Sequence, residues 1–247
     1  MDSNIVSHVL QYAGILIEAA LVLYLAWTSQ WKAEGGVGLY VTSLLFAQLT
    51  RAYVLRSYGL TSLPYFYVYW STDFLLVSSA FLLLWLFFRR ACRDEEDKWR
   101  LVRLLLVFVF VLVVGISGLT LSRNYSHLFP YFVYEFNQNL YFACLVLNTL
   151  LYLLLQYIDS IDEQLGLLVC GVGIQFAGPA ATLALVHLTA GERERFAQSF
   201  GSFIMRLCTL GMLLVWAYAI VHVKEKAIKV TRREIPVLAE VTANSNV

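Results

Sequence analysis

The chain has 247 residues, of which 60% are hydrophobic and 14% are charged, and its formal net charge is +1. Soluble domains contain roughly a quarter charged residues, so this composition indicates an integral membrane protein. The balanced charge provides no overall basic field for nucleic acid, and no nucleic-acid partner is expected.

Seven apolar runs follow one another along the chain. Each is long enough for a helix that crosses a bilayer core of about 30 Å. None shows the period-two alternation of barrel strands, so a helical bundle is favoured. The first run has no preceding basic segment or small-residue cleavage site, which is typical of a retained helix rather than a signal peptide. The predicted spans are about 5–27, 38–58, 64–88, 102–122, 131–156, 164–187 and 197–222.

Basic residues concentrate in alternate connections, as expected for the cytoplasmic side of a membrane. With the N-terminus outside, the outer connections carry Arg56, Arg123, Arg193 and Arg195. The inner segments carry Lys32, Arg89, Arg90, Arg93, Lys98, Arg100, Arg103, Lys224, Lys226, Lys229, Arg232 and Arg233. We therefore predict an all-α polytopic bundle, N-out and C-in, over residues 1–223. The compact connections favour a bacterial inner membrane.

Two predicted cytoplasmic segments are dense in charge. The 89–103 connection nearly balances acids and bases, which solvation and headgroup contact explain; docking of a protein partner is the alternative. Residues 224–247 form a basic juxtamembrane segment and a flexible tail, which anionic lipid attracts by roughly 1 kcal/mol per charge. Membrane lipids are thus expected partners, and a protein partner or a second copy would dock on either segment.

The third and fifth spans open with aromatic residues on the predicted outer side. An interfacial aromatic belt explains most of them, while the deeper Tyr69 and Tyr134 are candidates for a ligand cage. The sixth span carries Gly173, Ala177 and Ala181 at the spacing that lets helices approach closely. Pro179 beside Gly178 predicts either a kink there or a carbonyl freed for a ligand.

Five ionisable residues lie inside predicted spans, where a charge costs several kcal/mol unless it has a partner or a water-filled cavity. Arg51 lies about 11 Å and Asp73 about 14 Å from the predicted outer boundary, at a rise of 1.5 Å per residue. A short connection makes their helices neighbours, so we expect them to pair. The other three are Glu18, Glu135 and Arg206.

Further polar residues, including Gln11 and Gln48, share the outer half of the predicted bundle with Arg51 and Asp73. Structural ion pairs and interhelical hydrogen bonds explain such a set without any ligand. If the helix faces converge, the set lines a pocket open to the outside. The candidate ligand-binding residues are Arg51, Tyr69, Asp73, Tyr134, Glu135, Gln138, Gln175 and Arg206.

Glu18 lies about thirteen residues into the first span, near the midplane, with no basic residue at a matching depth. We expect it to hold a proton, to accept a hydrogen bond from a side chain such as Thr42, Ser43 or Asn148, or to contact a partner subunit.

The sequence lacks most signatures of known membrane enzymes and cofactor-binding proteins. The seventh span has no lysine for a retinal Schiff base, and an arginine cannot replace it. Gly115-Ile116-Ser117-Gly118 matches the Gly-x-Ser-Gly of rhomboid proteases but lacks their other signatures. The four cysteines fit no zinc motif and are expected to be free. We predict no cofactor, no metal and no enzymatic activity.

The favoured hypothesis is a sensor or complex subunit that binds a small ligand or lipid in an outer-half polar pocket. Arg51 and Arg206 would bind an anionic group, while Asp73 and Glu135 balance charge or accept a cation or proton. One alternative is a proton- or ion-coupled transporter with Glu18 and Asp73 as titrating groups. Another is a structural subunit of a membrane complex, with Glu18 facing a partner helix.

Overall fold

The computed structural model describes residues 3–28, 34–93, 95–121, 128–158, 162–188 and 194–223. This part of the chain is helical, with seven α-helices and no strand. The helices are α1 (Ser3–Trp27), α2 (Gly35–Tyr58), α3 (Leu63–Ala91), α4 (Glu96–Leu121), α5 (Leu128–Tyr157), α6 (Glu163–Leu188) and α7 (Glu194–Tyr218), which continues as a π-helical turn over Ala219–Val223. The all-helical prediction is confirmed.

The turn between α2 and α3 is set by local sequence. Gly59 ends α2 with a φ of 81°, a left-handed conformation that glycine adopts without strain. Ser62 caps α3 by accepting a hydrogen bond from the backbone N–H of Tyr65 at 3.3 Å, and Pro64 follows in the first turn. Because the connection is short, α2 and α3 are antiparallel neighbours.

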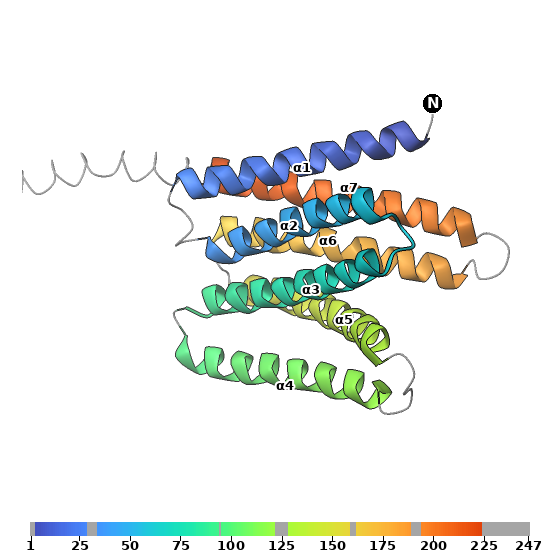
Figure 1. Cartoon of the computed structure of the whole chain (residues 1–247). Coiled ribbons are helices and arrows are strands. Elements are labelled where there is room, and N and C mark those ends of the chain that lie inside the picture. The colour runs from blue at the N-terminus through green and yellow to red at the C-terminus, as the bar shows by residue number, and fades with distance from the viewer. Residues whose placement is uncertain are drawn as a thin grey trace, which may run out of the picture.

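The seven helices lie side by side with alternating direction, and α1 and α4 occupy opposite edges (Figure 1). Helix α3 is central, since it contacts α2, α4, α5 and α6, whereas α1 packs against α2 and α7. We call the end that carries the start of α1 the N-terminal end of the bundle. The end of α2 and the starts of α3 and α7 lie there as well (Figure 1).

Five helical stretches among the described residues are long and apolar enough to cross a membrane. The outer face of α4 shows why a membrane suits this fold: Leu101, Leu104, Phe108 and Val111 are all exposed, and a contiguous apolar surface of this kind is unfavourable in water. The five stretches are Val9–Trp27, Leu63–Ala91, Glu96–Leu119, Glu135–Tyr157 and Phe203–Val221. By length and composition the chain is a multi-pass membrane protein.

At the opposite end of the bundle, α2, α6 and α7 close around Trp216. The Trp216 indole Nε1 donates to the Leu168 carbonyl at 2.9 Å, and its ring meets the Tyr40 ring edge-on at 5.8 Å. Gly171 makes room for this indole, because a Cβ there would lie 2.5 Å from Nε1. The packing therefore depends on a glycine in α6 facing a tryptophan in α7.

The small residues of α6 are used differently from the predicted series. Gly171 and Gly178 provide the close approach to α7, with a Cβ at position 178 lying 3.2 Å from Cys208. Gly173 instead faces Asn148 of α5, and Ala177 is exposed. The side chain of Ala181 lies outside the described residues. Spacing alone did not specify which stripe of small residues faces the neighbouring helix.

Arg90, at the end of α3, joins three helices at the opposite end. Its Nη1 donates to both carboxylate oxygens of Glu34, at 3.0 and 3.2 Å, just before α2. Its Nε donates to Asp162 at 2.9 Å and its Nη2 to Gln164 at 3.2 Å, at the start of α6. Asp162 also accepts the backbone N–H of Leu165 and so caps α6. This Arg90 cluster gives part of the predicted docking segment an internal structural role.

Candidate functional site

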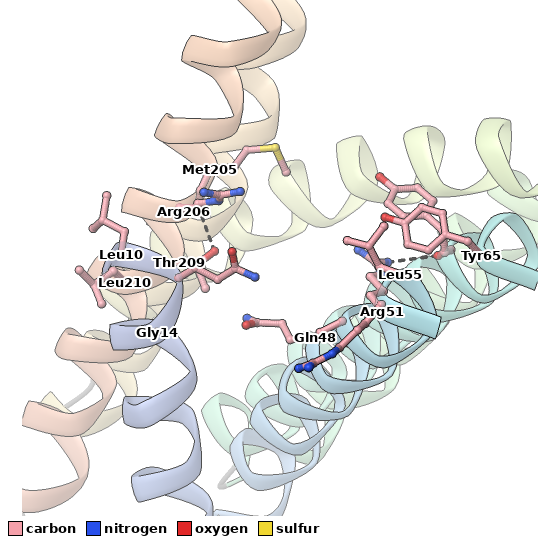
Figure 2. A pocket seen from close by; sticks show the side chains of 14 residues that line it. Leu10, Gly14, Gln48, Arg51, Leu55, Tyr65, Met205, Arg206, Thr209 and Leu210 are labelled. Carbon is pink, nitrogen blue, oxygen red and sulfur yellow. Dashed lines mark hydrogen bonds between the residues drawn. The ribbon is translucent and has the colours of Figure 1, made fainter. Parts of the chain in front are cut away.

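A cavity of about 700 Å³ opens at the N-terminal end, between α1, α2, α3 and α7. A volume of this size lies in the range of small-molecule sites. Figure 2 shows Gln48 reaching from α2 into the space that faces α1 and α7. The cavity is lined by Leu10, Gln11, Gly14, Gln48, Arg51, Ala52, Leu55, Arg56, Tyr65, Tyr69, Met205, Arg206, Thr209 and Leu210.

The described lining is cationic and apolar. Arg51, Arg56 and Arg206 bring three guanidinium groups to one cavity, and none of the described lining residues is an acid. Amides and a hydroxyl add neutral hydrogen-bonding groups, while leucines, Met205 and the tyrosines supply apolar surface. The combination suits a ligand with an anionic group and an apolar body.

Helical periodicity explains how the lining is assembled. On α2, Gln48, Arg51 and Leu55 recur at intervals of three and four, so they share one face of the helix. On α7, Arg206 and Leu210 are four residues apart and share a face in the same way. Helix α1 packs against both α2 and α7, so residues of all three helices line the same cavity.

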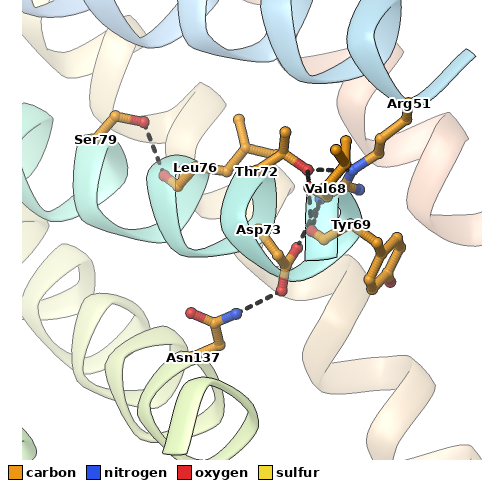
Figure 3. A network of polar contacts seen from close by, with 8 residues as sticks. All are labelled: Arg51, Val68, Tyr69, Thr72, Asp73, Leu76, Ser79 and Asn137. Carbon is orange, nitrogen blue, oxygen red and sulfur yellow. Dashed lines mark hydrogen bonds and ion pairs between the residues drawn. The ribbon is translucent and has the colours of Figure 1, made fainter. Parts of the chain in front are cut away.

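Arg51 is held in place from the side of α3 (Figure 3). Its Nε donates to the Thr72 hydroxyl at 2.7 Å, and its Nη2 donates to the Tyr69 carbonyl at 3.2 Å. The guanidinium carbon lies 4.4 Å from the centre of the Tyr69 ring, a cation–π contact. The expected pair with Asp73 forms, at 3.4 Å between Nη2 and Oδ1.

Asp73 lies behind Arg51 rather than on the cavity. Its second oxygen, Oδ2, accepts the side-chain amide of Asn137 on α5 at 2.7 Å (Figure 3). Asn137 is buried and is not among the predicted site residues. Its place on an apolar helix, at a depth similar to that of Asp73, is the sequence signal that could have identified it.

None of the α5 and α6 candidates whose side chains are described lines the cavity. Glu135 and Gln138 are half-buried on α5, and Gln175 lies on α6 with its buried Oε1 lacking a hydrogen-bond partner in the described structure. The side chain of Tyr134 lies outside the described residues. Helix α5 packs on α3, α4 and α6, away from α1 and α7. Of the eight predicted site residues, Arg51, Tyr69 and Arg206 line the cavity. Its other polar lining includes Gln11, Gln48, Arg56 and Tyr65.

Gly14 and Gln48 are the lining residues of α1 and α2 that lie farthest from the N-terminal end, and we call this part of the cavity its floor. Glu18 lies one helical turn beyond Gly14 on α1. Its side chain is fully buried, and its Oε1 accepts the Gln48 amide at 2.7 Å. The predicted hydrogen-bond partners were wrong in identity: the Ser43 hydroxyl, for example, donates to the Leu39 carbonyl. The predicted contact of Glu18 with a partner helix stays a prediction.

The four cysteines are free, and Cys144 is fully buried. Ser117 of the rhomboid-like tetrapeptide is buried as well and accepts a hydrogen bond from Asn139 at 3.3 Å. Searches of protein-family models, curated proteins and solved structures find no match to the chain. The geometry of the cavity is therefore the basis for inferring a function.

Proposed function

We propose that the chain is a seven-span protein of a bacterial inner membrane, N-out and C-in, that binds a small anionic ligand or an anionic lipid. It would act as a sensor or as a subunit of a membrane complex. The observation that carries the proposal is the convergence of Arg51, Arg56 and Arg206 on one largely apolar cavity.

The seven-span topology is supported by the dimensions of the two more polar helices. Helices α2 and α6 have 24 and 26 residues, which correspond to about 36 and 39 Å. Both lie alongside the apolar helices (Figure 1), and both exceed a bilayer core of about 30 Å. Three polar residues of α2, Gln48, Arg51 and Arg56, line the cavity.

A reporter experiment tests the topology. Green fluorescent protein fused after Val247 is expected to fluoresce, and alkaline phosphatase fused at the N-terminus behind an export signal is expected to be active. A dark C-terminal fusion together with an active C-terminal phosphatase fusion would contradict the C-in orientation.

The chemistry of arginine explains the choice of ligand. A guanidinium presents paired N–H donors that match a carboxylate, phosphate or sulfonate, and such charge-assisted bonds are stronger than neutral ones. Arg51 is pre-oriented by Thr72 and Tyr69, so little side-chain entropy remains to be lost on binding. Leu10, Leu55 and Leu210 would cover the apolar part of the ligand.

A bound anion would also connect helices that belong to different parts of the bundle. Arg51 belongs to α2, which is fixed on α3, whereas Arg206 belongs to α7, which packs on α1 and α6. An anion that contacts both would draw α7 toward α2. This movement would be passed to the opposite end, where the 89–103 segment would dock a partner.

The binding test uses the full chain in nanodiscs of phosphatidylcholine. Naphthalene-2-sulfonate serves as a soluble anion with an apolar body, and added phosphatidylglycerol serves as the anionic lipid. Thermal stabilisation by the sulfonate alone would indicate a free ligand, and retention of phosphatidylglycerol in native mass spectrometry would indicate a lipid headgroup. Both effects are expected to disappear in Arg206→Leu and to persist in Arg100→Leu, which removes an exposed arginine of α4. Equal effects in both variants would contradict the proposal.

A further inference from the structure

Glu18 is a buried carboxyl with a single hydrogen-bond donor. Its side chain has no exposed surface, and Gln48 donates to Oε1 at 2.7 Å. The other oxygen, Oε2, has no hydrogen-bond partner in the described structure. A carboxylate with one donor inside an apolar bundle would be costly, because a buried charge needs a counter-charge or several hydrogen bonds.

Among the described side chains of the neighbouring helices, no cation contacts Glu18. Helix α2 contributes Tyr40, which lies within electrostatic reach, and Arg51, whose guanidinium is turned toward Thr72 and Asp73 on α3. Helix α7 contributes Arg206, which lies on the cavity side, above the floor. Helix α3 contributes one acid, Asp73, which is paired with Arg51.

We propose that Glu18 is a proton-binding site, and that its proton and an anion in the cavity bind cooperatively. This inference rests on the proposed anion-binding function. Gln48 joins the two sites, because it lines the cavity and holds Glu18 Oε1. With the proton bound, Glu18 places no charge beneath the floor. Without it, a negative charge lies one side chain away from the anion and opposes its binding.

The direction of the pH dependence follows from this arrangement. At lower pH Glu18 is neutral and the anion binds well; as the pH rises the proton is lost and anion binding weakens. Linkage is reciprocal, so a bound anion makes Glu18 retain its proton to higher pH.

Infrared spectroscopy tests the proton without any ligand. A protonated carboxyl has a carbonyl stretching band that is separate from the bands of a carboxylate. The difference spectrum of the wild-type chain minus Glu18→Gln, at about pH 6, is expected to show this band. Its absence would overturn the proposal. If Glu18→Gln does not fold, a pH titration of the wild-type spectrum replaces the difference, and the midpoint must coincide with that of anion binding.

Calorimetry with naphthalene-2-sulfonate, which stays ionised throughout, tests the coupling. The wild-type affinity is expected to fall by about tenfold between pH ~5.5 and pH ~8.5, a usual size for coupling between two sites. Glu18→Gln is expected to bind equally well at both pH values, whereas Asp73→Asn keeps the pH dependence. Binding that is equally strong at both pH values in the wild type would overturn this inference alone. No binding at either pH would overturn the proposed function itself.

Discussion

Arginines at the two ends of this bundle differ in the number of acids around them. At the end opposite the N-terminal end, Arg90 donates hydrogen bonds to Glu34, Asp162 and Gln164 and so connects the ends of three helices. At the N-terminal end, three arginines line one cavity whose described lining contains no acid. Arg90 and Arg51 are similarly accessible, with 30% and 24% of the side chain exposed. Exposure therefore does not distinguish them, but the number of carboxylates does: Arg90 pairs with Glu34 and Asp162, whereas Arg51 pairs with Asp73 at 3.4 Å.

The difference gives a physical criterion for reading such residues. An arginine satisfied by two acids stabilises helix ends, and it gains little from a further anion. Three arginines that line one cavity, with no acid among the described lining residues, create a positive potential that attracts an external anion. The first arrangement predicts a loss of stability on mutation, and the second predicts a loss of ligand binding.

The largest expected effect is that of Arg90→Leu. It would leave Glu34 buried without its cation and lower the free energy of unfolding by about 2–3 kcal/mol, less than for a fully buried pair because Arg90 is partly exposed. Denaturant unfolding in mild detergent measures this loss. Arg89→Leu, which removes the exposed neighbouring arginine, is the control and is expected to cost less than ~0.5 kcal/mol. Equal losses in both variants would break the assignment of Arg90 as a structural residue.

Gly171→Ala tests the closed packing around Trp216. The new Cβ would lie 2.5 Å from the indole Nε1, so the ring must shift and the hydrogen bond to Leu168 weakens. We expect a destabilisation of about 1–3 kcal/mol and a change in tryptophan fluorescence. Gly166→Ala is a matched control on the same helix, because a Cβ there meets nothing within 4 Å. Unchanged stability in Gly171→Ala would show that this end is less tightly packed than the structure indicates.

Asp73→Asn is expected to change stability least, and it tests whether Asp73 weakens the attraction of Arg51 for an anion. It removes the negative charge behind Arg51. The amide oxygen can still accept from Arg51, while the amide NH2 would face Asn137, whose side chain must turn its own oxygen toward it. The free energy of unfolding should fall by less than ~1 kcal/mol, because the pair is partly exposed and long. Anion affinity should rise by about threefold, since Arg51 is then less neutralised. Calorimetry with naphthalene-2-sulfonate measures this change, and weaker binding would instead assign Asp73 a direct role in the site.

The helices were predictable because hydropathy over about 20 residues reports span length directly. The depth of Arg51 and Asp73 was also readable, since rise per residue is constant and their connection is short. The rotation of each helix was not readable. Successive residues differ by about 100° around the axis, so Asn137 and Gln138 face different neighbours although their depths nearly match.

Lipid-facing and interior surfaces are both apolar, which removes the contrast that reveals a buried face in soluble helices. For this reason the sequence did not reveal which glycines of α6 face α7. The predicted series begins at Gly173, whereas Gly171 and Gly178 make the contact. The missing contrast also explains why Gln48 was not recognised as the partner of Glu18. Their backbone depths differ by a few residues, and two long side chains bridge that difference.

The central claim is that the cavity at the N-terminal end is an anion site built by Arg51 and Arg206. Its most direct test is the affinity for naphthalene-2-sulfonate, measured by calorimetry on the full chain in phosphatidylcholine nanodiscs at about pH 6. Loss of one charge-assisted contact of about 1.5–3 kcal/mol predicts that Arg206→Leu binds at least about tenfold more weakly than the wild type, while Arg90→Lys does not. Wild-type affinity in Arg206→Leu would contradict the account.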